Sequence, residues 1–85
     1  MLKHKIVVKN PIGIHLRPAG EIAEAAIKFK NCDIYLASGG RAVSGKSLLS
    51  ILSLGIKPDA EVEIICDGSD EEAAMKAVLA AADDL

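Results

Sequence analysis

The residue types that could carry out chemistry are concentrated in Gly13–Gly20, which reads Gly-Ile-His-Leu-Arg-Pro-Ala-Gly. The preceding residues, Asn10–Gly13, have the composition of a turn. We predict that a helix begins just after His15, because the first turn is where a helix tolerates a proline such as Pro18. The imidazole of His15 would then lie beside the free N–H groups of that turn, at the positive end of the helix dipole.

This placement predicts that His15 accepts and donates a phosphoryl group. The positive potential disfavours the imidazolium and leaves a neutral, nucleophilic ring, and it stabilises an attached phosphoryl group. Arg17 adds a cation whose forked donors suit phosphate oxygens. The alternative is a histidine that only caps the helix. A cation is disfavoured at a helix start, so the presence of Arg17 there favours the functional interpretation.

A second unusual segment, Ser47–Leu54, is expected to form a short helix capped by Ser47 and ended by Gly55. Apolar residues fall on nearly every side of it, and a thin domain covers only one side of a helix. Part of the helix is therefore expected to be exposed as a docking surface for a partner, although a helix buried all round is the alternative. The predicted docking residues are Leu16, Leu48, Leu49, Ile51 and Leu52.

The composition excludes several other classes of function. The 85 residues fit one domain, spanning 1–85, and the net charge of −2, with scattered basic residues and two aromatics, argues against nucleic-acid binding. The charged N-terminal segment is not a signal peptide and no stretch could span a membrane, so we expect a cytoplasmic protein. Cys32 and Cys66 lack a CxxC partner and are expected to be buried free thiols. We expect a monomer that holds neither a metal nor a cofactor.

Periodicity predicts the elements that position these residues. Strands are expected over Met1–Lys9, Cys32–Leu36, Gly40–Val43 and Ala60–Cys66, and helices over Leu16–Lys30 and Ser47–Leu54. A capping box over Ser69–Glu72 is predicted to open a last helix. Its apolar stripe comprises Met75, Val78, Leu79, Ala82 and Leu85. The order βαββαβα predicts an α+β, two-layer open-faced sandwich, with a four-stranded antiparallel sheet and three helices on one face.

Two segments carry a resemblance to a known family. Gly13–Ala19 resembles the active-site motif of HPr, the histidine-containing phosphocarrier of the phosphoenolpyruvate-dependent sugar phosphotransferase system. Lys46–Ile56 is similar to the second signature of that family, around its regulatory serine. The order of the elements agrees as well, so the resemblance covers essentially the whole chain.

The resemblance implies a phosphoryl relay rather than a stand-alone catalyst. His15 would receive the group from enzyme I and pass it to enzyme IIA domains for sugar uptake, with Arg17 assisting and the short helix docking both partners. Ser47 would be phosphorylated by an ATP-dependent HPr kinase/phosphorylase. We further predict that phosphorylation of Ser47 switches docking off, because the phosphate would place about two negative charges beside the apolar face.

This chain departs from the family pattern at three positions, and a competing motif overlaps its second signature. The family usually has a small residue at the position of Leu16, and Met and Gly at Leu49 and Ser50, so a regulatory, nitrogen-type paralogue remains an alternative. Gly40–Ser47 also fits the phosphate-binding pattern G-x-x-x-x-G-K-S, which would indicate a small nucleotide-binding module. We reject that interpretation because 85 residues leave no room for the parallel βαβ units of such a protein.

Overall fold

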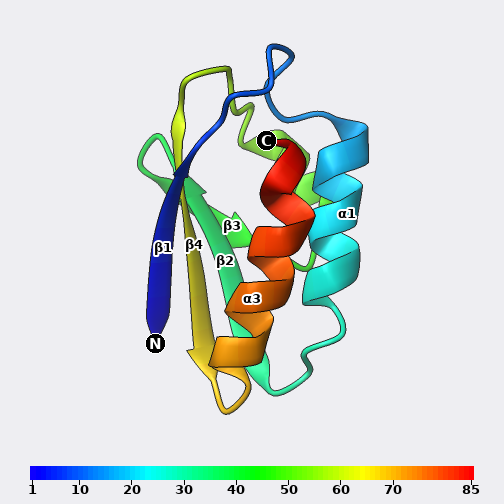
Figure 1. Ribbon diagram of the computed structural model, residues 1–85, viewed down its shortest axis with the longest axis vertical. Helices are drawn as coiled ribbons and strands as arrows, with labels where there is room; N and C mark the ends of the chain where they lie inside the picture. Colours follow the sequence, from blue (N-terminus) through cyan, green and yellow to red (C-terminus); the bar gives the residue numbers. More distant parts are fainter.

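The computed structural model describes residues 1–85, except for the side chain of Asp84. Four strands and three α-helices alternate in the predicted order βαββαβα (Figure 1). The strands are β1 (Leu2–Val7), β2 (Cys32–Ser38), β3 (Arg41–Ser44) and β4 (Glu61–Gly68). The helices are α1 (Leu16–Ala26), α2 (Leu48–Ser53) and α3 (Glu71–Ala81), and a 3₁₀ turn, Ala82–Asp84, follows α3.

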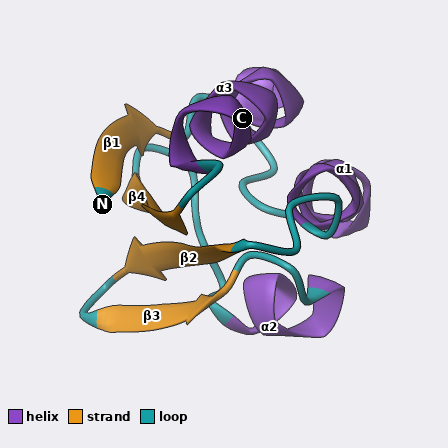
Figure 2. Cartoon of the chain, turned by 90° about the horizontal axis from the view of Figure 1, so that it is seen from below, coloured by secondary structure: helices purple, strands orange, loops and turns teal.

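The strands form one antiparallel sheet in the order β1-β4-β2-β3. Seen along the strands, α1, α2 and α3 all lie on the same side of this twisted sheet (Figure 2). The predicted fold class, an open-faced two-layer sandwich, is therefore confirmed. Because β1 and β3 are the edge strands, the central pair β4 and β2 carries most of the core.

The core lies between the central strands and the helices. In β2 and β4, alternate residues are buried, as expected for strands with one face packed and one face in water. The side chains with essentially no exposed surface come from these strands, from the helices and from the end of the β1 segment. The largest of them are Val8, Ile22, Ile34, Leu36, Ile51, Val62, Ile64, Cys66 and Val78. The predicted apolar stripe of α3 is also confirmed, since its residues are buried or packed against this core.

The predicted limits of α1 and of the first strand are wrong. Helix α1 ends at Ala26 instead of Lys30. The apolar periodicity stops there, because Ile27 is exposed, and the N–H of Phe29 bonds to the Ala26 carbonyl at 3.2 Å in a turn that leads into β2. The first strand, expected over residues 1–9, is confined to Leu2–Val7.

The predicted capping box is also wrong. The N-cap of α3 is Asp70, one residue later than the predicted capping box requires, and its side chain makes no capping hydrogen bond. Glu71 instead reaches back, and its Oε1 accepts from the N–H of Gly68 at 3.2 Å. The predicted start of the third strand at Gly40 moves to Arg41, because Gly39 and Gly40 form the turn with φ of +59° and +80°.

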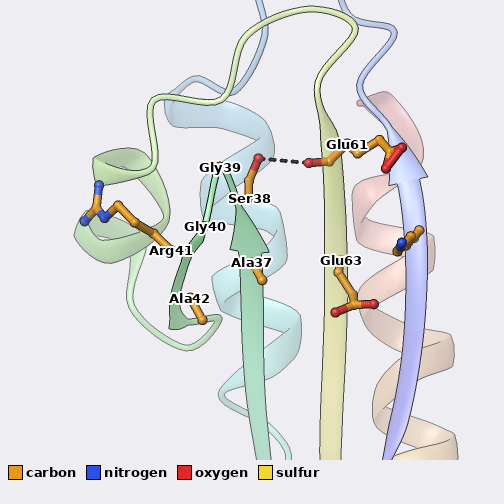
Figure 3. Close-up of a pocket in the computed structure, with 9 residues that line it drawn as sticks. Ala37, Ser38, Gly39, Gly40, Arg41, Ala42, Glu61 and Glu63 are labelled. Atoms are coloured by element: carbon orange, nitrogen blue, oxygen red, sulfur yellow. Dashed lines mark hydrogen bonds between the residues drawn. The ribbon is translucent and has the colours of Figure 1, made fainter.

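The sheet face away from the helices carries a shallow hollow of about 420 Å³ beside the β2–β3 turn (Figure 3). Small residues of β2, β3 and their turn form its floor, and Lys5, Glu61 and Glu63 lie on the neighbouring strands. Ser38 Oγ closes one end by donating to the Glu61 carbonyl at 2.8 Å. The polar character of this face agrees with the predicted one-sided sheet.

Candidate functional site

His15 lies where the sequence predicts it, at the N-cap of α1. Its backbone is extended, with φ of −145° and ψ of −177°, and its carbonyl accepts the first helical hydrogen bond, from the Ala19 N–H at 3.1 Å. Its side chain does not cap the helix. His15 is half-buried, so its side chain is still accessible from solvent. The free N–H groups of the first turn therefore provide positive potential beside an imidazole that makes no capping hydrogen bond.

The loop that leads into His15 is fixed by contacts with the α2–β4 connection. The N–H of Ile14 donates to the Ile56 carbonyl at 2.9 Å. Gly13 has φ of +79°, and a Cβ added there would come within 2.5 Å of the same Ile56 oxygen. Only glycine fits both the backbone angle and this close approach, so Gly13 determines how the chain enters α1.

A cavity of about 260 Å³ opens beside the imidazole, and Asn10, His15, Arg17 and Pro18 line it. Pro18 is buried at the third position of α1 and has no N–H to leave unpaired. Arg17 projects into solvent with 79% of its side chain exposed, and its Nε lies 3.5 Å from Glu21 Oε1. An exposed pair of this kind contributes about 0.2–1 kcal/mol, so Glu21 holds the Arg17 side chain only weakly.

Ser47 occupies the N-cap of α2, as predicted. Its Oγ accepts from the N–H of Ser50 at 3.2 Å, and its carbonyl accepts from the N–H of Ile51 at 3.0 Å. At the other end of this helix, Arg41 Nη1 donates to the Ser53 carbonyl at 2.9 Å, which places a cation at the negative end of the helix dipole. Ser47 is half-exposed, at the start of a helix whose two ends are both stabilised by side-chain hydrogen bonds.

The predicted docking residues are not equally available. Leu16 and Leu49 are exposed, at 65% and 78%, while Leu48 and Leu52 are partly buried against the core. Ile51 is completely buried, so the expectation of an exposed docking side chain at Ile51 is wrong. Helix α2 packs beside α1 and close to the sheet (Figure 2), and Ile51 is on the side that faces the core.

Two residues near His15 were not singled out from the sequence. Ile12 is 70% exposed in the loop before α1, and Asn10 lines the cavity beside the imidazole. The sequence indicated only a turn at these positions. A turn folds the chain back on itself, so residues five positions apart meet, and no periodic pattern reports such a contact. We refer to Ile12, Leu16 and Leu49 below as the apolar rim.

The segment that fits the nucleotide-binding pattern does not form a phosphate loop. Strand β3 runs through it, and Lys46 Nζ donates to the Phe29 carbonyl at 2.7 Å. The sheet is antiparallel, and the following helix α2 has only six residues. The geometry therefore agrees with the rejection of a nucleotide-binding module.

The two cysteines are buried free thiols, as predicted. Burial raises the pKa of Cys32, and it raises the pKa of Cys66 to about 11. Among the described side chains, no three histidine, cysteine or acidic residues gather in an arrangement that could hold a metal ion. In the part of the chain that the structure describes, no helix is both long enough and apolar enough to cross a membrane.

An open-faced sandwich whose first helix starts at an accessible histidine defines the class of small phosphohistidine carrier domains. The family model described as "PTS HPr component phosphorylation site" matches residues 2–84. The chain therefore belongs to the HPr family of phosphocarriers of the phosphotransferase system.

Known proteins agree in sequence and in structure. The phosphocarrier protein HPr of Mycoplasma genitalium is 41% identical over 80 residues, which cover 94% of this chain and 91% of that protein. The structure of a Mycoplasma histidine-containing phosphocarrier protein superposes with a TM-score of 0.91 at 28% identity, over 94% of this chain and 90% of that one. The HPr of Thermoanaerobacter tengcongensis gives 0.88 at 34% identity, over 98% and 92% of the two chains.

Proposed function

We propose that this phosphocarrier receives a phosphoryl group on His15 from enzyme I, which takes it from phosphoenolpyruvate, and passes it to enzyme IIA domains for sugar uptake. The observation that supports this proposal is the half-buried imidazole at the N-cap of α1, beside free N–H groups and a cavity. The phosphohistidine keeps a labile N–P bond, so the group can move on. Phosphoenolpyruvate is a cytoplasmic metabolite, and the relay accordingly operates in the cytoplasm.

Arg17 stabilises the phosphoryl group in this proposal. Arg17 lines the cavity next to His15, and its Nε forms an exposed ion pair with Glu21. A phosphoryl group carries more charge than a carboxylate and accepts forked donors. The arginine therefore moves from Glu21 to the phosphate when His15 is loaded, and returns when the group leaves.

The apolar rim is the proposed docking surface for both partners. Its members lie in the loop before His15, at the first position of α1 and on α2, which packs beside α1. Exposed large apolar side chains near a reactive group are typical of a surface that a partner covers. Leu48 and Leu52 are half-buried at the margin of the core, and their exposed parts extend this docking surface.

Ser47 is the proposed regulatory phosphorylation site. A phosphate at the N-cap would meet free N–H groups and the positive end of the α2 dipole, so the fold would tolerate it. It would also place about two negative charges two residues before Leu49. A partner that packs on Leu49 would have to desolvate or repel this charge, and docking would weaken.

The experiment is a two-step transfer. The chain is loaded with labelled phosphoenolpyruvate and a bacterial enzyme I, separated from the donor, and mixed with a sugar-type or a nitrogen-type enzyme IIA domain. The proposal predicts that label leaves this chain and accumulates on the sugar-type domain within seconds to minutes. Label that stays on the chain contradicts the relay, and transfer confined to the nitrogen-type domain would assign the chain to a regulatory branch instead.

A further inference from the structure

We propose that Glu21 competes with the phosphoryl group on His15 for Arg17, and that this competition makes the loaded histidine a better phosphoryl donor. The inference rests on the proposed function, in which Arg17 stabilises the phosphoryl group. It assigns a positioning role to Glu21, a residue that lies outside the Gly13–Ala19 motif and does not line the cavity beside His15.

Arg17 is the residue that links Glu21 to the site. It lines the cavity together with His15, and its Nε lies 3.5 Å from Glu21 Oε1. Side chains of an α-helix lean towards its N-terminus, and residues four positions apart are neighbours on its surface. The carboxylate of Glu21 is therefore carried back towards the start of α1, where His15 lies.

Glu21 carries the first negative charge of α1. The first turn of this helix contains no acidic residue, so no carboxylate on that turn offsets the positive potential of its free N–H groups. Glu21 acts instead on Arg17, the cation that this turn contains. A carboxylate beside the guanidinium offsets part of the charge with which Arg17 attracts a phosphoryl group.

The pair between Arg17 and Glu21 is weak enough to be broken. The two atoms are farther apart than the roughly 2.7–2.9 Å of a charge-assisted hydrogen bond, and the two side chains are 79% and 42% exposed. An exposed pair of this kind changes an equilibrium by a factor of about two to five. Its loss is therefore measurable, and a more highly charged phosphoryl group can take Arg17 from it.

The competition has a defined sign. In the unloaded protein the pair with Glu21 is intact and stabilises the unloaded state. Loading of His15 either breaks this pair or leaves a carboxylate close to the phosphoryl oxygens, and both raise the free energy of the loaded state relative to the unloaded one. Transfer of the group to an acceptor restores the pair, so Glu21 favours release of the phosphoryl group.

The equilibrium of loading tests the inference without a contribution from docking. Enzyme I in catalytic amount speeds the exchange between phosphoenolpyruvate plus this chain and pyruvate plus the phosphorylated chain, but it does not change the final ratio. Glu21→Gln keeps the size of the side chain and removes its charge. We expect this variant to raise the equilibrium constant for loading about two- to fivefold.

The matched control is Glu24→Gln, which removes the same charge from an exposed position on the same helix. Glu24 lies seven positions from Arg17, too far along the helix for an ion pair, so the constant should not change. A double-mutant cycle shows whether Glu21 acts through Arg17. In the Arg17→Ala background there is no guanidinium to compete for, so Glu21→Gln should leave the loading constant unchanged.

The outcomes separate this inference from the proposed function. Equal loading constants for the wild type and Glu21→Gln would overturn the inference, and so would a lower constant in the variant. A rise that persists in the Arg17→Ala background would also overturn it, because Glu21 would then act without Arg17. If the wild-type protein is not phosphorylated on His15 at all, the proposed function fails, and the role of Glu21 fails with it.

Discussion

Replacing Leu49 with aspartate should weaken docking to enzyme I while leaving the fold intact. Leu49 has 78% of its surface exposed on α2, so the folded protein gains little from it. Substitutions at such positions usually change stability by less than about 0.5 kcal/mol. A partner that covers the apolar rim, by contrast, would bury this side chain.

The magnitude follows from the exposed area. Complete burial of a leucine side chain contributes about 1.5–3 kcal/mol, and most of the Leu49 surface is still available for a partner to bury. Loss of this contact alone costs about 1–2 kcal/mol, which corresponds to a KM about five- to thirtyfold higher. An aspartate adds the cost of desolvating a charge, so the upper part of that range is expected.

The assay is steady-state phosphorylation by enzyme I, with the KM for this protein and its thermal unfolding measured in parallel. The matched control is Ile27→Asp. Ile27 is 53% exposed at the other end of α1, and its replacement by aspartate introduces the same charge as Leu49→Asp. Ile51→Ala provides the opposite control. It should cost about 2–5 kcal/mol of stability, because Ile51 is buried in the core.

An unchanged KM for Leu49→Asp would refute the assignment of the rim as the docking surface. An equal rise for Leu49→Asp and Ile27→Asp would refute it as well, because the effect would then be one of net charge. A raised KM accompanied by a large loss of stability in Leu49→Asp would contradict the structure, which places this side chain in solvent.

Three further predictions concern other positions. Arg17→Ala should slow phosphoryl transfer at least tenfold with a stability change below about 1 kcal/mol, because its pair with Glu21 is exposed; unchanged rates with a sharp drop in Tm would make Arg17 structural. Ser47→Asp should keep or slightly raise Tm, since a charge at the N-cap contributes about 0.3–1 kcal/mol, while transfer falls about tenfold; transfer at the full rate would leave Ser47 as a cap only. Burial raises the pKa of Cys66 from 9.0 to about 11, so the unfolded thiol loses its proton first and stability should fall as pH rises from 9.0 towards 11. Urea unfolding at both ends of this range should show a smaller fall in Cys66→Ala than in the wild type, and equal falls would contradict the role of Cys66.

Periodicity predicted the elements whose apolar residues all face one way. Alternation identified β2 and β4, because each has one face against the helices, and helical spacing identified the buried side of α3. The placement of His15 followed from Pro18, which fixes the start of α1 by a local steric rule. These features depend on neighbouring residues, so the sequence alone was sufficient to predict them.

The remaining features depend on contacts that local patterns do not report. Helix α2 is apolar on nearly every side, so its sequence could not distinguish the buried Ile51 from the exposed Leu49. The cavity position of Asn10 depends on how a turn closes. Helix α3 starts one residue later than predicted, and Glu71 accepts from the N–H of Gly68, a contact that a count of spacings cannot anticipate.

The central claim is that His15 carries the phosphoryl group, and labelling of His15→Ala tests it most directly. Wild-type protein and the variant are incubated with enzyme I and labelled phosphoenolpyruvate, and the bound label is measured after acid and after alkali. We predict one label per wild-type chain, labile in acid and stable in alkali, and no label on His15→Ala. Undiminished labelling of a folded His15→Ala protein would contradict the account.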